Sequence, residues 1–149
     1  MSKKNIIIIS LILFLTSCGF SPIYYNNKNV NFSIEKVDYT GDREFNNFLK
    51  VNLDKYKNQK ADNKIFIKAQ SEYEKNILSK DSTGKVTSYE LEVQVTFLVK
   101  SNNKKIKITE KKIIDSMDDK FEETRREKSV KQSFASSISI KLLSELTIN

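Results

Sequence analysis

The sequence predicts an α+β domain: a four-stranded, mainly antiparallel sheet that carries two helices on one face. Apolar and polar residues alternate strictly over 88–100, which indicates a strand with one buried and one solvated face. Apolar residues recur instead at helical spacing over 42–57 and 119–146, on either side of the β-rich middle of the chain. The resulting order is β-α-β-β-β-α, in which both helices bury their apolar stripes against the same sheet.

The first expected strand covers 31–38, with Phe32 and Ile34 on one face. A turn at 40–42 follows, and Asp42 is a good N-cap because its carboxylate can accept a bond from a free N–H of the first helical turn. We expect an amphipathic helix of about four turns after it. Its apolar positions are Phe45, Phe48, Leu49, Leu53 and Tyr56.

Two tight turns join the remaining strands into two long antiparallel hairpins that share the middle strand. Alternation over 65–73 indicates the strand that precedes the first turn, at 81–84. The second turn lies at 101–104, and the last strand runs over 106–114. The shared strand should supply the main core, through Tyr89, Leu91, Val93, Val95, Phe97 and Val99.

The C-terminal helix opens at 119–122, which has the spacing of a capping box with Asp119 as the cap. Lys131 interrupts the apolar stripe, so the first half of this helix should be less buried. The stripe consists of Ala135, Ile138, Leu142 and Leu146. We interpret the nearby carboxylates as helix capping and solvated surface, not as a catalytic pair; they are Asp118, Asp119, Glu122, Glu123 and Glu127.

Residues 1–17 have the layout of a secretory signal, with a positively charged start, an apolar run over 6–15 and small residues at its end. Cys18, the only cysteine, follows Leu15-Thr16-Ser17 as in a bacterial lipobox. We expect cleavage before Cys18 and attachment of a diacylglycerol to its thiol. The alternative is an incidental cysteine behind an ordinary signal, but a lone cysteine has no disulfide partner in an oxidising compartment.

This interpretation divides the chain into a signal peptide at 1–17, a lipidated tether at 18–30 and one periplasmic α+β domain at 31–149. The apolar run is about half of the roughly 20 residues that a spanning helix needs, which indicates anchoring and not spanning. Two acyl chains anchor a protein stably. Gly19, in place of an aspartate, favours the outer membrane, with the domain on its periplasmic side.

The chain carries a net charge of +7, and removal of the signal with its two lysines leaves +5 on the side chains. This charge suits an anionic partner such as a phosphorylated lipid head group, although AT-rich codon usage also enriches lysine. The chain has no histidine, which removes Ser-His-Asp triads and histidine metal sites. We therefore expect no enzyme, no cofactor and no metal, and export argues against nucleic-acid binding.

The segment Cys18-Gly19-Phe20-Ser21-Pro22-Ile23-Tyr24 resembles the start of the LPS-assembly lipoproteins of the LptE family, especially the alphaproteobacterial ones. The segment 41–44 that opens the first helix, the strand 89–99 and the final helix are also similar to that group. The final helix departs from the group, with fewer alanines and more charge.

The resemblance implies a non-enzymatic protein that binds an outer-membrane β-barrel, sits partly inside it, helps it assemble and contacts lipopolysaccharide. A similar fold can serve another envelope system, so an auxiliary or lipid-binding lipoprotein of an ABC-type transporter is the alternative.

The turn lysines are the candidate lipopolysaccharide contacts, because a lysine is a mobile point charge that suits phosphates. Lys80 and Lys85 flank the first turn, and Lys104 and Lys105 lie at the second. Hairpin geometry places the two pairs at opposite ends of the shared strand. We favour the Lys80 and Lys85 end; the alternative is that all four are solvated turn residues.

Overall fold

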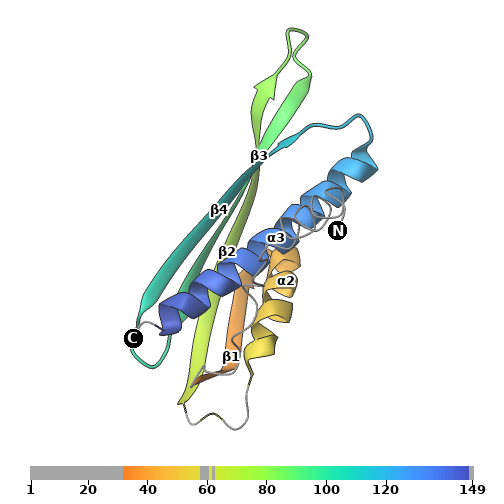
Figure 1. Ribbon diagram of the computed structural model, residues 1–149. Helices are drawn as coiled ribbons and strands as arrows, with labels where there is room; N and C mark the ends of the chain where they lie inside the picture. Colours follow the sequence, from red (N-terminus) through yellow and green to blue (C-terminus); the bar gives the residue numbers. More distant parts are fainter. Residues whose placement is uncertain (1–31, 58–60, 62, 148–149) are drawn as a thin grey trace, which may run out of the picture.

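The structure is a computed structural model that describes residues 32–57, 61 and 63–147. The predicted order of strands and helices is confirmed (Figure 1). The elements are β1 (Phe32–Gly41), α2 (Arg43–Leu53), the short 3₁₀ helix η1 (Asp54–Tyr56), β2 (Asn63–Lys80), β3 (Val86–Val99), β4 (Lys105–Asp115) and α3 (Lys120–Thr147).

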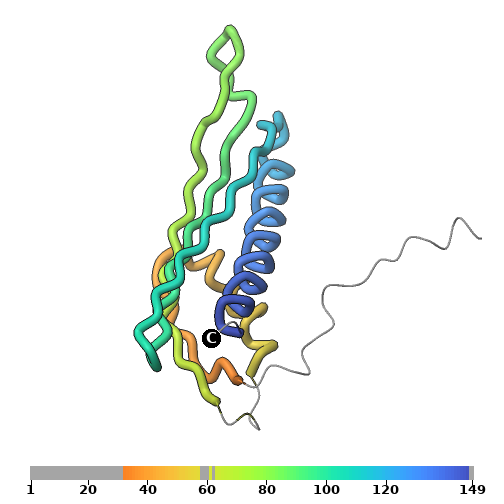
Figure 2. Tube along the Cα trace, turned by 60° about the vertical axis from the view of Figure 1, so that its left-hand side comes forward, coloured from red at the N-terminus to blue at the C-terminus, as the bar shows by residue number. Residues whose placement is uncertain are grey.

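The four strands form one mixed sheet in the order β1-β2-β3-β4. β1 is parallel to β2, and the other two pairings are antiparallel, which confirms the two hairpins that share β3. The parallel pair follows from the connection through α2, because a crossover helix returns the chain to the end at which it started. α2 and α3 lie on one face of the sheet, and no helix of the described residues covers the other face (Figures 1 and 2).

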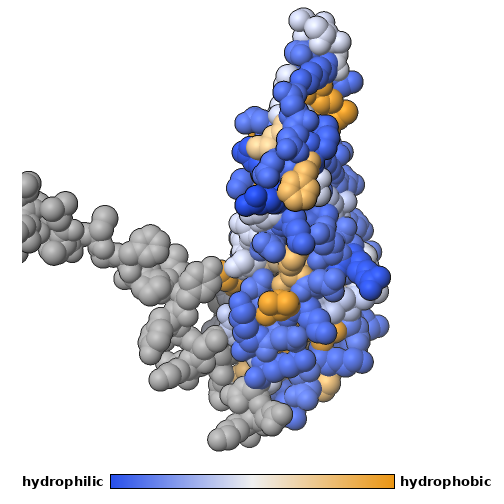
Figure 3. Space-filling model, turned by 90° about the vertical axis from the view of Figure 1, so that its right-hand side faces the viewer, coloured by the Kyte–Doolittle hydropathy of each residue, from blue (hydrophilic) through white to orange (hydrophobic). Residues whose placement is uncertain are grey.

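The core lies between the sheet and the two helices, as the alternation in β3 predicts. Leu91, Val93, Val95 and Phe97 are completely buried, and Tyr89 packs at the edge of the same cluster. α2 adds Phe45 and Leu49 to this cluster, and α3 adds Ile138 and Leu142. The surface outside the core is mainly hydrophilic on the side shown in Figure 3.

Two boundaries differ from the expectation at the first connection. β1 continues to Gly41, beyond the expected end at residue 38, because its pairing with β2 persists to Ser71. α2 ends at Leu53 after 11 residues, and η1 completes the expected four-turn stripe as a tighter turn that packs Tyr56 against the core. Asp42 is the predicted N-cap, since its side chain accepts from the Phe45 N–H at 2.7 Å.

The β2–β3 hairpin is longer than its apolar pattern indicates. β2 has 18 residues and β3 has 14, and their paired ends project beyond the helical layer (Figures 1 and 2). The residues of this projection are mostly polar, and its adjacent apolar residues Ile77 and Leu78 break the alternation that marks a half-buried strand. Strand pairing alone therefore extends the hairpin, and it moves the 81–84 turn away from the core.

Candidate functional site

The structure places the four predicted lysines at opposite ends of β3, as expected. Lys80 pairs with Val86 where β3 begins, and Leu98 near its other end pairs with Lys105. A strand of this length separates the two turns by roughly 45 Å. The two lysine pairs are therefore separate surfaces, and no single small ligand touches both.

The β2–β3 turn is held by Asp81. Its Oδ1 accepts from the Thr83 N–H at 2.8 Å, the Thr83 hydroxyl at 2.7 Å and the Lys85 N–H at 3.0 Å. These bonds lower the pKa of Asp81 below its ordinary value, and the bond from the Thr83 hydroxyl has the largest effect. Gly84 completes the turn at φ +85°, a backbone conformation that favours glycine. The turn thus has a defined shape, although all its residues are exposed.

The two lysines of this turn differ in their surroundings. The Lys85 Nζ donates to the Asp118 carboxylate at 2.6 Å, and this bond raises the pKa of Lys85 and lowers that of Asp118. Both side chains are more than half exposed, so the pair contributes little to stability and is free to exchange partners. Lys80 is exposed and forms no ion pair among the described residues. This end therefore presents one free lysine and one in a labile pair.

At the β3–β4 turn, the two lysines have different roles. The Lys104 Nζ donates to the main-chain carbonyl of Glu145 at 2.9 Å and lies 3.4 Å from its carboxylate. A cation at the C-terminal end of a helix satisfies free carbonyls, so Lys104 ties this turn to the end of α3. Lys105 is exposed and forms no ion pair within the described part of the chain. Lys105 is therefore available to a ligand, and Lys104 is engaged in the fold.

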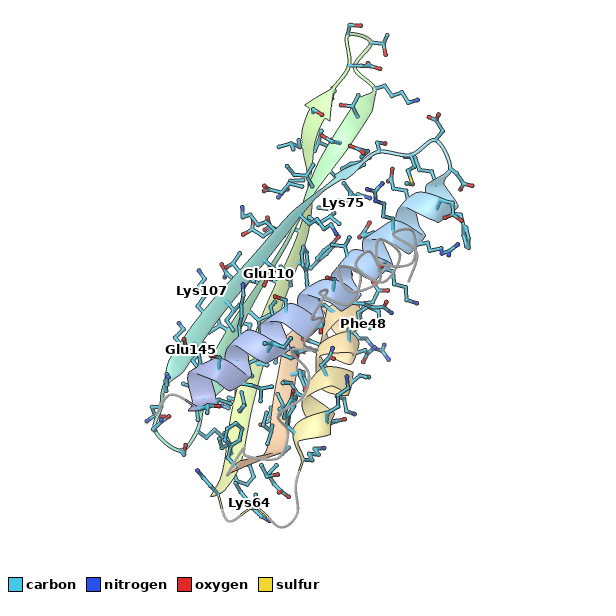
Figure 4. All side chains as sticks on the ribbon, viewed as in Figure 1. Phe48, Lys64, Lys75, Lys107, Glu110 and Glu145 are labelled. Carbon is cyan, nitrogen blue, oxygen red and sulfur yellow. The ribbon has the colours of Figure 1, made fainter. Side chains whose placement is uncertain are left out.

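Two hollows meet at Lys105. One, of about 580 Å³, lies between β4 and the last turns of α3, and Lys104, Lys105, Lys107, Lys141 and Glu145 are among its lining residues. The other, of about 460 Å³, lies on the open sheet face and is lined by Asp38, Thr40, Lys68, Ala69, Gln70, Thr96, Leu98 and Lys105. Figure 4 shows Lys107 on β4 and Glu145 near the end of α3.

Sequence reasoning missed three of these lysines: Lys68, Lys107 and Lys141. The alternation of β4 places Lys105 and Lys107 on one face, so Lys107 could have been found from the sequence. Lys68 could not, because its position depends on the register that pairs it with Leu98, which in turn pairs with Lys105. Lys141 reaches the hollow only through the packing of α3, where it also lies 2.7 Å from Glu110.

Charge divides the molecule into two ends. The end opposite the β2–β3 turn consists of 32–38, 50–57, 63–68, 98–108 and 141–147, and we call it the basic end. It carries eleven lysines and four carboxylates. The other described residues, which we call the hairpin end, carry eleven basic and fourteen acidic side chains.

The surrounding charge therefore favours anion binding near Lys104 and Lys105 over the turn that carries Lys80 and Lys85. The preference for Lys80 and Lys85 stays a prediction.

A buried charged cluster joins α3 to β2. The Glu127 carboxylate accepts from the Tyr73 hydroxyl at 2.8 Å and from the Lys75 Nζ at 3.0 Å. Lys75 also donates to Glu123 at 3.1 Å. Glu123 also accepts a hydrogen bond from the Met117 N–H at 3.0 Å. This bond, followed by the bonds from lysines, lowers the pKa of Glu123 to about 2. Burial and the bond to Glu127 raise the pKa of Tyr73.

Lys131 belongs to this cluster. The first half of α3 is less buried than the second, as expected, but Lys131 itself is buried. Its side chain is 8% exposed, and its Nζ lies 2.9 Å from the Glu44 carboxylate and 3.9 Å from the centre of the Tyr73 ring. A cation can be buried here because carboxylates and an aromatic face replace water. The first half of α3 thus packs through this charged cluster together with one buried apolar side chain, Val130.

The acidic residues near the start of α3 include the predicted helix cap, but Glu123 and Glu127 are held in ion pairs and are not the solvated surface that was predicted. Asp119 caps the helix by accepting from the Phe121 and Glu122 N–H groups at 2.8 and 3.2 Å. Glu123, and not Glu122, reaches back to residue 117, which moves the expected capping-box contact by one residue. Among the described residues, no group of three or more acidic or thiol side chains could hold a metal ion, and no buried polar side-chain atom lacks a partner.

Within the described ranges, no helix combines the length and apolar character that crossing a bilayer requires.

No protein-family model matches the sequence, and no curated protein matches it. The fold, however, is shared with bacterial lipoproteins.

We describe three of the solved structures that share this fold. Rare lipoprotein B from Shewanella oneidensis has a TM-score of 0.53 at 16% identity, over 74% of this chain and 92% of that one. An uncharacterized lipoprotein B from Nitrosomonas europaea has a TM-score of 0.51 at 18% identity, over 76% and 83%. A minor lipoprotein from Acinetobacter baumannii has a TM-score of 0.50 at 15% identity, over 73% and 92%.

This likeness to rare lipoprotein B is a likeness of fold. It covers nearly the whole length of the neighbouring chains, so the strands and helices described above account for their architecture as well. Cys18, the predicted lipidation site, and the tether at 18–30 lie outside the described residues.

Proposed function

We propose that this protein is an outer-membrane lipoprotein of the LptE type, in its alphaproteobacterial form, that partners a lipopolysaccharide-translocating β-barrel and assists lipopolysaccharide assembly. The observation that carries the proposal is the fold shared with rare lipoprotein B, found in a chain that also has a lipobox and the 18–24 motif. Neither feature alone is specific to this function. Their combination favours it because the motif resembles the start of the same class of lipoprotein.

The role is binding and not catalysis. The sequence contains no histidine, and the described carboxylates of the cluster on α3 are occupied by lysines and main-chain N–H groups. Exposed apolar side chains lie on both sheet faces of the hairpin end, where a protein partner can bury them; they are Ile77, Leu78 and Ile113. The domain is therefore suited to positioning a partner or a lipid at the membrane.

Lipidation of Cys18 is the first requirement of this proposal. Cys18→Ser should leave an uncut precursor without an acyl label. Intact-mass analysis of the membrane-extracted protein should show a mature chain that begins at Cys18 and carries the lipid. A mature chain that begins elsewhere, with a free thiol, would contradict the proposed anchoring.

Depletion of the protein in its native bacterium tests the function. Newly made lipopolysaccharide should disappear from the cell surface and accumulate inside the envelope, and re-expression of the unaltered chain should restore export. Cys18→Ser should restore export poorly. Normal surface lipopolysaccharide after depletion, together with the loss of a different transport activity, would instead support an auxiliary role in an ABC-type system.

A further inference from the structure

We propose that the open sheet face at the basic end docks onto the surface of an anionic phospholipid bilayer, with Lys68, Lys105 and Lys107 against the lipid phosphates. The proposal rests on the lipid anchor of the proposed function, because an anchor at Cys18 brings this face to a membrane. It adds a second, electrostatic contact that sets the orientation of the domain.

The three lysines form one surface because of the strand register. Lys68, Leu98 and Lys105 are direct neighbours across β2, β3 and β4, and Lys107 lies opposite Thr96 on the next rung of the same face. Leu98 lines the 460 Å³ hollow between the flanking lysines, and Phe66 on the same face is 40% exposed. Cations around exposed apolar groups match the chemistry of a head-group region, where phosphates lie above acyl chains.

The charges of these lysines are not used by the fold. All three side chains are exposed, and none forms an ion pair among residues 32–57, 61 and 63–147. Asp38, the carboxylate that lines the hollow, is already bound by Lys100 at 2.8 Å and by Lys36 at 3.0 Å. The bond from Lys100, and then that from Lys36, lowers the pKa of Asp38 to about 2. Asp38 is therefore ionised at neutral pH, and the two lysines compensate its charge. An anion at this surface therefore meets uncompensated positive charge.

The position of the tether supports a membrane as the occupant. β1 begins at Phe32, which pairs with Asn63 at the start of β2, at the same end of the sheet as the β3–β4 turn. The 13 residues between Cys18 and Phe32 span at most about 45 Å. Anchoring thus keeps the basic end within one tether length of the bilayer, and anionic lipids then attract its lysines once they lie within a screening length. The hairpin end, with its excess of carboxylates, then faces away from the membrane.

Vesicle binding by the mature chain tests the proposal. Cys18→Ser removes the anchor, so that only the protein surface contributes to binding. The probe is a vesicle of phosphatidylethanolamine with about one-third phosphatidylglycerol, and vesicles of neutral lipid serve as the blank. We expect cosedimentation with the anionic vesicles at low salt, little with the neutral ones, and a decrease at high salt.

Two triple variants with the same net charge locate the surface. Lys68→Glu/Lys105→Glu/Lys107→Glu should weaken binding by at least about tenfold. The matched control is Lys112→Glu/Arg126→Glu/Lys128→Glu, which changes exposed basic side chains of the hairpin end that also lack ion pairs in the described chain, and it should weaken binding less than about threefold. Circular dichroism establishes that each variant is folded, and the corresponding glutamine triple replaces any that is not.

Equal losses in the two variants would overturn the proposal, because binding would then follow net charge alone. It would also be overturned if the Lys68, Lys105 and Lys107 variant lost binding to lipopolysaccharide aggregates and kept binding to phosphatidylglycerol vesicles. Neither result touches the proposed function, whose failure would appear separately as normal lipopolysaccharide export after depletion.

Discussion

Gly41 shows how one residue sets the connection between β1 and α2. Its φ is +95°, and a Cβ at this position would collide with the main-chain carbonyl oxygen of Ser71 on β2. The chain leaves β1 here and enters α2, and a buried network holds the corner: Ser71 Oγ donates to Asn46 Oδ1 at 2.8 Å, and Asn46 Nδ2 donates to the Thr40 carbonyl at 3.0 Å. A small residue is therefore required where the two strands approach.

Gly41→Ala should destabilise the protein strongly. The left-handed backbone costs about 1–2 kcal/mol for a residue with a Cβ, and displacement of β2 adds about 1–3 kcal/mol. Gly84→Ala is the matched control, because Gly84 has φ +85° but open space around it, so only the first cost applies. Urea denaturation measures both changes. Equal destabilisation by the two variants would show that β2 does not restrict Gly41.

Glu123 should make stability depend on acid pH. Its folded pKa is lowered from 4.5 to about 2, first by the Met117 N–H and then by lysines. A carboxyl with a depressed folded pKa contributes stability above its unfolded pKa and loses this contribution as the pH falls through the folded pKa. Glu123→Gln should therefore be less stable than the parent at pH 7, and the gap should narrow between pH 4.5 and pH 2. A gap in denaturation midpoint that stays constant with pH would contradict this account.

At the scale of elements, β3 separates a buried face from a partly solvated one. Phe97→Ala, on the buried face, should cost about 3–5 kcal/mol because it leaves a cavity among completely buried neighbours. Gln94→Ala, on the open face, should change the free energy of unfolding by less than about 0.5 kcal/mol. Denaturation of the two variants checks this difference. Comparable costs would mean that a partner or another element covers both faces.

The β2–β3 turn is the element that carries the predicted lipopolysaccharide contacts. Lys80→Glu/Lys85→Glu should weaken binding of the unlipidated chain to lipopolysaccharide and flatten its salt dependence, because two phosphate-seeking charges are reversed. Lys112→Glu/Lys128→Glu is the control at the same end of the molecule. Unchanged affinity in the folded Lys80 and Lys85 variant would show that these lysines are solvated turn residues only.

The elements with apolar periodicity could be predicted from the sequence, and the elements held by pairing or charge could not. β3, α2 with its Asp42 cap, and the apolar stripe of α3 all appear where their periodicity places them. The far part of the β2–β3 hairpin was missed because its adjacent apolar residues, Ile77 and Leu78, break the alternation. The burial of Lys131 was not predicted because its partners, Glu44 and Tyr73, are distant from it in the sequence.

For the candidate site, the positions of the lysines could be predicted from the sequence, but their contacts could not. Turn signals located Lys80, Lys85, Lys104 and Lys105 and placed them correctly at opposite ends. Their environments depend on contacts distant in sequence: Lys85 meets Asp118, and Lys104 meets Glu145. The surface around Lys68 depends on register across three strands, which no local pattern determines.

At the scale of the whole molecule, the fold separates a basic end from a projecting hairpin end. The described chain enters at the basic end, and the hairpin extends from the opposite end beyond the helices (Figure 1). In the membrane-docked orientation that we propose, the basic end faces the bilayer that holds the anchor, and the hairpin end is left for a protein partner or lipopolysaccharide. The separation of the two ends follows from the sheet register and from the length of β2 and β3.

Affinity purification of the tagged, lipidated protein from detergent-extracted envelopes of its native bacterium tests the central claim most directly. The account predicts a stable complex with one outer-membrane β-barrel, recognised by a band that changes mobility on heating and identified by mass spectrometry. The same barrel should be lost when the hairpin end is altered at its exposed apolar residues Ile77, Leu78 and Ile113. Recovery of an inner-membrane transporter in place of a barrel would contradict the account.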